Sequence, residues 1–332
     1  MSRRMKRPWL APLTPLYAAA AALRNRRFDR GSAAIRRLAR PVVSIGNLSA
    51  GGSGKTPLVI ALAQALSARG LHVDVLSRGY GRQSSLPARV DPNGSALDFG
   101  DEPLLIARTA QVPVYVARQR YDAGLLAEAE AAAPLSDAAA HLLDDGFQHR
   151  QLVRAVDIVL LSRADFQDTL LPAGNLREPL RAAARAHILA VPAGDSTLEE
   201  ALGAHGLQQP IWRLRRVMEV PAVSGPVVAF CGIARPEQFF AELEAAGHVL
   251  AARIAFRDHH FYSRADLDRL LARARAASAA ALLTTEKDAV RLSALLASAP
   301  PPMAVLTVPL RMEIENAPAA VDGLLARIGV LS

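Results

Sequence analysis

The stretch SIGNLSAGGSGKTP, Ser44 to Pro57, decides the fold of this chain. It comes close to the phosphate-binding loop pattern, in which a glycine is followed by four free positions and then by Gly-Lys-Ser/Thr. Counting back from Gly54, the first glycine of that pattern would stand at the position that Ser49 occupies. A strand-like run, 41–47, precedes the loop and a helix-like run, 56–70, follows it, which is the context that such a loop requires. The stretch therefore predicts a nucleotide site with its own loop geometry in a parallel α/β sheet.

The glycines and the two residues after them supply the chemistry of this loop. Gly51, Gly52 and Gly54 allow the backbone to turn its N–H groups inward as an anion nest at a helix N-terminus. Lys55 would then bridge the outer phosphates, and Thr56 would offer its hydroxyl to Mg²⁺. The alternative is a glycine-rich turn before an unrelated helix, which the strand-loop-helix context makes the weaker interpretation.

The residue before the glycine pair separates two kinds of phosphate-loop protein. Partition-type ATPases use Lys-Gly-Gly-x-Gly-Lys-Thr, and their first lysine reaches across a dimer. Ala50 stands in that place here. A loop without the dimer-sensing lysine favours a phosphotransferase over the alternative, a partition- or metallochaperone-type NTPase that drives protein association.

Composition limits the class of protein further. The chain has 332 residues, 51% of them hydrophobic and 21% charged, which predicts a globular protein with one large or two medium α/β domains. Its single cysteine, Cys231, excludes an intrachain disulfide and a cysteine metal cage. The net charge of +8 indicates attraction to a polyanion. Zinc-finger spacing and single-strand-binding motifs do not occur in the sequence, so we expect anionic lipid or a phosphorylated substrate and no nucleic acid.

The N-terminus is basic, then apolar from Trp9 to Leu23, then basic again. As a helix the apolar part would rise roughly 22 Å, which is short of the roughly 30 Å hydrocarbon core of a bilayer. A signal peptide, a short spanning helix and an ordinary packed amphipathic helix are alternatives. An interfacial anchor fits best, because Trp9 and Tyr17 suit the headgroup level and the flanking arginines suit an anionic leaflet.

After position 41 the chain alternates short apolar runs with helical patterns, as βαβ units do. The pattern restarts near Pro221 and again shows strand, turn and helix. We therefore expect a phosphate-loop domain with a parallel sheet and a smaller C-terminal α/β domain. The expected division is 1–35 for the membrane-associating helix, 36–200 for the kinase domain, 201–220 for a linker and 221–332 for the C-terminal domain.

Carboxylates follow one of the expected strands. HLLDDGFQH places Asp144 and Asp145 at the end of an apolar run, where a Walker B aspartate holds Mg²⁺. Successive strand residues point to opposite faces, so both could meet one metal only if the strand has broken, and Gly146 suggests that it has. A solvated turn explains these residues about equally well.

Three other short stretches carry polar groups whose plain interpretation is a helix start or a surface turn. GDEP contains Asp101, RDHHFYS contains paired histidines, and LPAGNLREP contains Arg177 and Glu178. Such loops become binding sites when they lie at the carboxyl ends of parallel strands. In TTEKDAV, Lys287 and Asp288 are adjacent, which fails the guanine-reading spacing and favours ATP over GTP.

Taken together, the sequence resembles the tetraacyldisaccharide 4′-kinase family of the lipid A pathway. The stretches that carry the resemblance occur in order over positions 41–290: GNLSAGGSGKTP, SRGYG, GDEP, DDGFQH, LPAGNLREP, DHH and TTEKDAV. The resemblance implies ATP- and Mg²⁺-dependent phosphorylation of the 4′-hydroxyl of a tetraacylated glucosamine disaccharide 1-phosphate. The product would be the 1,4′-bisphosphate, the lipid A precursor lipid IVA, made at the cytoplasmic face of the inner membrane by a peripheral or monotopic enzyme.

The resemblance also implies roles for individual residues. Asp101 matches the catalytic carboxylate and His259 the histidine that assists it, while Asp145 and Glu178 match further acidic residues of the active site. Thr56 and Asp144 are the expected Mg²⁺ ligands. Polar residues near the phosphates or the disaccharide are Arg120, Gln148, His149 and Arg177. The residues expected to hold ATP are Ser49, Ala50, Gly51, Gly52, Ser53, Gly54, Lys55 and Thr56.

Overall fold

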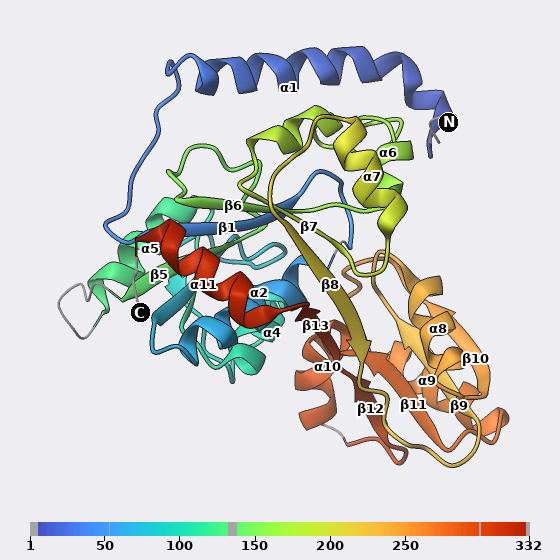
Figure 1. Ribbon diagram of the computed structural model, residues 1–332. Coiled ribbons are helices and arrows are strands. Elements are labelled where there is room, and N and C mark those ends of the chain that lie inside the picture. The colour runs from blue at the N-terminus through green and yellow to red at the C-terminus, as the bar shows by residue number, and fades with distance from the viewer. Residues whose placement is uncertain (1–5, 53, 132–137, 299, 330–332) are drawn as a thin grey trace.

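The computed structural model describes residues 6–52, 54–131, 138–298 and 300–329. Two β-sheets organise these residues, a large sheet of nine strands and a small sheet of four (Figure 1). The strand order of the large sheet is β13-β8-β7-β6-β1-β5-β2-β4-β3. Its strands are β1 (Val42–Asn47), β2 (His72–Ser77), β3 (Ala88–Arg89), β4 (Val114–Val116), β5 (Ala139–Asp144), β6 (Val156–Leu160), β7 (Ile188–Pro192), β8 (Ile211–Met218) and β13 (Leu310–Ile314).

The large sheet is parallel from β8 to β4, and only its two edge strands, β13 and β3, run antiparallel to their neighbours. Every residue of the central strand β1 (VVSIGN) is buried, because helices cover both faces of the sheet, and the strand accordingly has no charged residue. One face packs against α2 (Lys55–Ser67), α4 (Asp101–Ala110) and α11 (Ala317–Ile328). The other face packs against α5 (Arg120–Ala129), η2 (Leu180–Arg185) and α7 (Ser196–Ala204).

The small sheet has the order β10-β9-β11-β12 and is parallel throughout. Its strands are β9 (Val227–Cys231), β10 (Leu250–Ala255), β11 (Ala281–Thr285) and β12 (Val305–Val308). The helices of this part are α8 (Pro236–Ala245), α9 (Arg264–Ala276) and α10 (Glu286–Ser298). Helix α10 also contacts α4 of the large sheet's layer, so the two sheets meet along these helices.

Two segments differ from the division expected from the sequence. The expected linker, 201–220, contains β8, which pairs with β7 and extends the large sheet. The last part of the expected C-terminal domain belongs to the large sheet instead. The chain leaves the small sheet after β12, at Pro309, and returns as β13 to pair with β8. Helix α11 then packs in the core of the large sheet. Pro309 divides the apolar run 303–310 between the two sheets, because proline cannot donate a hydrogen bond to a strand ladder.

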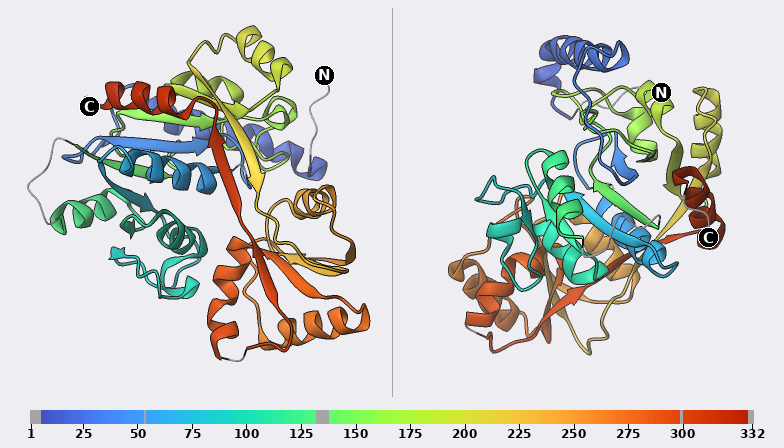
Figure 2. Two further views of the ribbon diagram at one scale, coloured as in Figure 1. Left: turned by 60° about the horizontal axis from the view of Figure 1, so that its bottom comes forward. Right: turned by 90° about the vertical axis from the view of Figure 1, so that its left-hand side faces the viewer.

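The N-terminal segment lies along the outside of the large sheet's layers, on the side away from the small sheet (Figures 1 and 2). It consists of η1 (Pro8–Leu13) and α1 (Thr14–Asp29), and neither helix has a buried residue. Among the described residues no helix combines the length and the apolar character needed to cross a bilayer. Short helices α3 (Ala96–Phe99) and α6 (Arg163–Gln167) complete the described elements.

Candidate active site

The phosphate loop leaves β1 and enters α2 at the carboxyl edge of the large sheet. Gly51 and Gly54 have φ angles of 106° and 87°, which only glycine adopts without strain, so the loop turns as the sequence predicts. Lys55 opens α2, and its Nζ donates to Asn47 Oδ1 at 3.1 Å and lies 3.5 Å from Asp145 Oδ1. The lysine is therefore aimed across the ends of β1 and β5. Ser53, which belongs to the expected ATP loop, lies outside the described residues.

The segment LPAGNLREP braces this loop through the backbone. Ala50 N–H donates to Asn175 C=O at 2.8 Å, and Arg177 N–H donates to Leu48 C=O at 2.7 Å. The side chain of Gln148 adds a hydrogen bond to Asn47 C=O at 2.9 Å. The backbone of this segment thus supports the phosphate loop and holds the side chain of Arg177 near it.

The acidic pair after β5 occupies two different environments. Strand β5 ends at Asp144, and Asp145 has a φ angle of 50°, so the strand has broken between them, as Gly146 suggested. Asp144 Oδ2 accepts from Ser77 Oγ at 3.1 Å, while its buried Oδ1 has no hydrogen-bond partner in the described part of the chain. Asp145 instead accepts from Arg177 at 2.9 Å. Asp144 is therefore the carboxylate with capacity left for a cation.

The electrostatics of the pair agree with this difference. Burial, together with the negative charges of Glu102 and Asp145, raises the pKa of Asp144 to about 7. Burial also acts on Asp145, but the charges of Lys55 and Arg177 outweigh it and lower its pKa. A divalent cation at Asp144 would remove the mutual repulsion and favour the ionised form of both carboxylates.

Cations gather beside Asp145. Arg120, at the start of α5, is 8% exposed, and its Nε has no hydrogen-bond partner among the described residues. Burial lowers the pKa of Arg120, an effect that the charges of Asp145 and Asp144 partly offset. Burial and the charges of Arg120 and Arg154 lower the pKa of His149 to about 4, so this imidazole is neutral near pH 7. Arg120 is thus a buried and incompletely paired cation, and together with Lys55 and Arg177, which pair with Asp145, it is suited to an anionic ligand.

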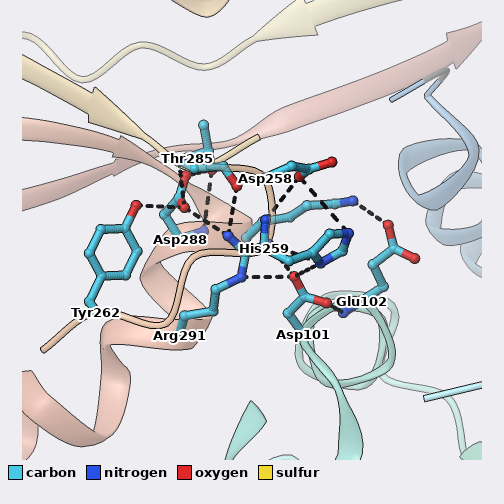
Figure 3. Close-up of polar contacts among 10 residues, drawn as sticks. Asp101, Glu102, Asp258, His259, Tyr262, Thr285, Asp288 and Arg291 are labelled. Atoms are coloured by element: carbon cyan, nitrogen blue, oxygen red, sulfur yellow. Dashed lines mark hydrogen bonds and ion pairs between the residues drawn. The ribbon is translucent and has the colours of Figure 1, made fainter. Parts of the chain in front are cut away.

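A carboxylate and an imidazole meet where the two parts of the chain come together beside α4 and α10 (Figure 3). Asp101 is the first residue of α4, and His259 follows β10 in the other part of the chain. His259 Nδ1 lies 3.0 Å from Asp101 Oδ2. The hydrogen bond to Asp101 raises the pKa of His259. Burial raises the pKa of Asp101, but the bond from His259 and the charge of Arg291 outweigh it and hold that pKa well below its usual range. The structure thus brings together two residues that the sequence separates by 158 positions.

Further hydrogen bonds, centred on Arg291, hold the Asp101–His259 pair in place, and the sequence did not predict them. Arg291 of α10 donates to Asp101 Oδ2 from Nε at 2.8 Å and also from its terminal nitrogen. The same guanidinium donates to Gly232 C=O at 2.8 Å and to Asp288 at 3.0 Å. Tyr262 donates to the same Asp288 oxygen at 2.8 Å. The i, i+3 spacing of Asp288 and Arg291 in TTEKDAVRL was the available signal, but by itself it indicates only a helix-surface pair.

A cavity of about 440 Å³ opens beside the pair. It lies between the turn after β2 and the loop after β10, so both parts of the chain contribute to its walls. The residues that line it are Tyr80, Gly81, Asp101, His259, Phe261 and Arg291.

Glu178, an expected catalytic residue, lies under the N-terminal helix. Its Oε2 accepts from Asn25 of α1 at 2.7 Å and from Arg185 at 2.8 Å. Its described partners include neither the phosphate loop nor Asp101, so the structure gives Glu178 a place in the docking of α1. Its catalytic role stays a prediction.

The fold and the strand-loop-helix unit define the class of this protein, an α/β protein with a phosphate-loop kinase fold. A solved structure described as the "apo" form of LpxK from Aquifex aeolicus in complex with ATP is similar to it, with a TM-score of 0.75 and 31% sequence identity. That similarity covers 98% of this chain and 99% of the other. The predicted fold class is thereby confirmed.

Comparison at the level of sequence gives the family. The model of the family described as tetraacyldisaccharide-1-P 4′-kinase matches residues 6–329. A tetraacyldisaccharide 4′-kinase of Koribacter versatilis is 42% identical over 95% of this chain and 97% of its own length. One of Parvibaculum lavamentivorans is 42% identical over 86% of this chain and 81% of its own. The chain belongs to the tetraacyldisaccharide 4′-kinase family, which confirms the resemblance and disfavours the partition-type alternative.

Proposed function

We propose that this chain transfers the γ-phosphate of ATP to the 4′-hydroxyl of a tetraacylated glucosamine disaccharide 1-phosphate and releases the 1,4′-bisphosphate. The observation that carries the proposal is the meeting of His259 Nδ1 and Asp101 Oδ2 at 3.0 Å in a chain of this family. A phosphate loop alone fits hydrolysis as well as transfer. A base placed beside a cavity at the same sheet edge supports transfer to an acceptor hydroxyl.

The donor side of the reaction depends on positioning and charge. Lys55, Arg120 and Arg177 would neutralise charge on the triphosphate, and the loop glycines would offer backbone N–H groups. Mg²⁺ fits the residues present, since it is usually held by one or two carboxylates together with substrate phosphates. Asp144, with its unpartnered buried oxygen, and the hydroxyl of Thr56 would hold it. When bound, Mg²⁺ would supply charge stabilisation at the transferring group.

The acceptor side depends on the Asp101–His259 pair. With Nδ1 of His259 engaged by Asp101, its Nε2 is the nitrogen available to take the proton of the attacking hydroxyl. Asp101 stays ionised, orients the ring and stabilises the imidazolium that forms. The two residues come from different parts of the chain and already meet at 3.0 Å in this structure, so the contact between these parts keeps the base assembled.

The helix α1 supports a membrane location for this reaction. Trp9 is exposed on η1, and Leu23 is exposed near the end of α1, next to Arg24 in the sequence and close to Arg26 and Arg27. Apolar groups next to arginines suit the interface of an anionic bilayer. We therefore place the enzyme on the cytoplasmic face of the inner membrane, where ATP and the glycolipid are both within reach.

The Leu16→Glu variant is expected to bind vesicles of anionic lipid at least about tenfold more weakly than the unmodified protein. Leu16 is 71% exposed on α1, and burying one leucine in the interface contributes roughly 1.5–3 kcal/mol. The matched control is Leu86→Glu, because Leu86 is also 71% exposed but lies outside the N-terminal helix. Co-sedimentation with phosphatidylglycerol vesicles measures the effect. Equal loss in both variants would contradict the role of α1.

Mass spectrometry of the product tests the proposed reaction. Incubation with ATP, Mg²⁺ and the disaccharide 1-phosphate in detergent should add one phosphate to the glycolipid, and chelation of Mg²⁺ should stop the addition. ATP consumption without a phosphorylated lipid would contradict the proposal.

A further inference from the structure

Helix α1 docks on the protein with a side that carries few large apolar groups. Its partly buried positions recur at helical spacing: Thr14, Tyr17, Ala18, Ala21, Ala22, Asn25 and Phe28. The exposed positions include Leu16 and Leu23, and no residue of α1 is fully buried. A surface helix normally packs its apolar stripe against the core. Burial of apolar surface therefore contributes little to the docking of α1, and its polar contacts decide where it lies.

Two polar side chains of α1 reach the segment LPAGNLREP. Tyr17 Oη donates to Arg177 C=O at 3.0 Å, and Asn25 Nδ2 donates to Glu178 Oε2 at 2.7 Å. Glu178 has an exposed fraction of 0%, and its Oε1 has no hydrogen-bond partner among the described residues. A hydrogen bond to a buried charge contributes more than one between neutral groups. The bond from Asn25 is therefore important for the placement of Glu178.

Arg177 joins three parts of the structure through three different groups. Its N–H donates to Leu48 C=O at 2.7 Å, at the start of the phosphate loop. Its C=O accepts from Tyr17 of α1. Its guanidinium donates to Asp145 at 2.9 Å, in the acidic pair after β5. A shift of the backbone at this residue therefore moves the contact with the loop and the guanidinium together.

We propose that Tyr17 and Asn25 are positioning residues of the phosphate site. Tyr17 holds the backbone of Arg177 and Asn25 holds the neighbouring Glu178, so that α1 fixes the guanidinium of Arg177 beside Asp145 and the phosphate loop. This inference rests on the proposed kinase function. It gives α1 a role in the reaction in addition to its contact with the membrane, although neither side chain touches a substrate.

Two substitutions that remove only the polar contacts test the proposal. Tyr17→Phe deletes one hydroxyl, and Asn25→Leu replaces the amide with an apolar group of similar size. In detergent micelles with the glycolipid, each variant should lower kcat/KM for ATP by about five- to tenfold, the effect of one lost hydrogen bond. Isothermal titration with Mg·ATP should show a loss of affinity in the same direction. Unchanged values in both variants would overturn the proposal.

Thr14→Val is the matched control on the same side of the same helix. It also removes one hydroxyl, but Thr14 Oγ1 is buried without a hydrogen-bond partner among the described residues. Its kcat/KM for ATP should therefore stay within about twofold of the normal value. A loss as large as that of Tyr17→Phe would show that any change on this side of α1 impairs the enzyme, which would contradict the specific contacts.

Binding to phosphatidylglycerol vesicles separates positioning from anchoring. Tyr17→Phe and Asn25→Leu change side chains that contact the protein, so co-sedimentation with the vesicles should stay within about twofold of normal. Unfolding temperatures should stay close to that of Thr14→Val. A loss of vesicle binding as large as the loss of activity would show that the two residues act through the membrane contact, and would refute the positioning role.

A double-mutant cycle with Arg177 tests the route of the effect. In the Arg177→Ala background the guanidinium is absent, so addition of Tyr17→Phe should lower single-turnover rates by less than about twofold. A merely structural role of Tyr17 would instead give the full loss again in this background, and that result would overturn the proposal.

The measurements also separate this inference from the function on which it rests. An unmodified protein that never phosphorylates the glycolipid refutes the kinase proposal. The affinity for Mg·ATP needs no acceptor, so it still tests whether α1 positions Arg177. An active protein whose Tyr17→Phe and Asn25→Leu variants keep normal ATP affinity and normal kcat/KM refutes the positioning role alone.

Discussion

The Lys55→Ala variant is expected to keep its fold and to lose phosphotransfer by a factor on the order of 10³. Lys55 opens α2, and its Nζ reaches Asn47 at 3.1 Å, where β1 ends and the phosphates would lie. Removal of this charge leaves the developing negative charge of the transferring group without its nearest fixed cation. Initial rates with saturating ATP and glycolipid measure the loss.

A second cation near the same helix provides the control. Arg69 follows α2 and pairs with Asp322 on the protein surface. Arg69→Ala removes the same unit of charge from the far end of the helix, and its rate should stay within about twofold because exposed pairs contribute little. If Lys55→Ala retained more than a tenth of the normal rate, the loop would not be the phosphate site.

Substitution in the Asp101–His259 pair is the second large effect. His259→Ala and Asp101→Asn should each lower kcat by about 10²- to 10⁴-fold, the usual contribution of a positioned base, with little change in the KM for ATP. The reason is that the pair acts on the acceptor proton, whereas the phosphate loop holds ATP. Single-turnover rates at saturating ATP measure it. Unchanged kcat in both variants would remove the pair from the mechanism.

The pH dependence of kcat tests the same pair independently. A base must be unprotonated to act, so activity should fall as the pH drops through the pKa of His259. The hydrogen bond to Asp101 raises that pKa above its ordinary value of 6.5. In Asp101→Asn this effect is lost, and the acidic limb of the residual activity should move to lower pH. Arg69→Ala, which removes a surface cation that pairs with Asp322, is the control whose limb should not move.

The sequence was sufficient for the parts of the fold that depend on local pattern. The apolar run 41–47 and the helical run after it identified β1 and α2, the apolar run before Asp144 identified β5, and the glycines identified the loop. It was not sufficient for the path of the C-terminus. The sequence of a strand of four or five residues does not indicate which sheet the strand joins. The pairing of β13 with β8 of the large sheet is determined by tertiary packing, so the sequence did not predict it.

The active site shows the same limit. From the sequence alone, Asp101 could be explained as a helix start and His259 as one of two adjacent histidines in a surface turn. Only the family resemblance predicted that both belong to one active site. The structure separates the histidines: His259 contacts Asp101, whereas His260 contacts Asp266 of the capping box at α9 and stacks on Phe256. Arg291 was missed because the residue that it holds lies 190 positions away.

Transfer of radiolabelled γ-phosphate from ATP to the disaccharide 1-phosphate tests the central claim most directly. We predict that the purified protein places one label on the 4′-position of the glycolipid and that Lys55→Ala places essentially none. Label that appears only as inorganic phosphate, or that reaches the lipid equally with Lys55→Ala, would contradict the account.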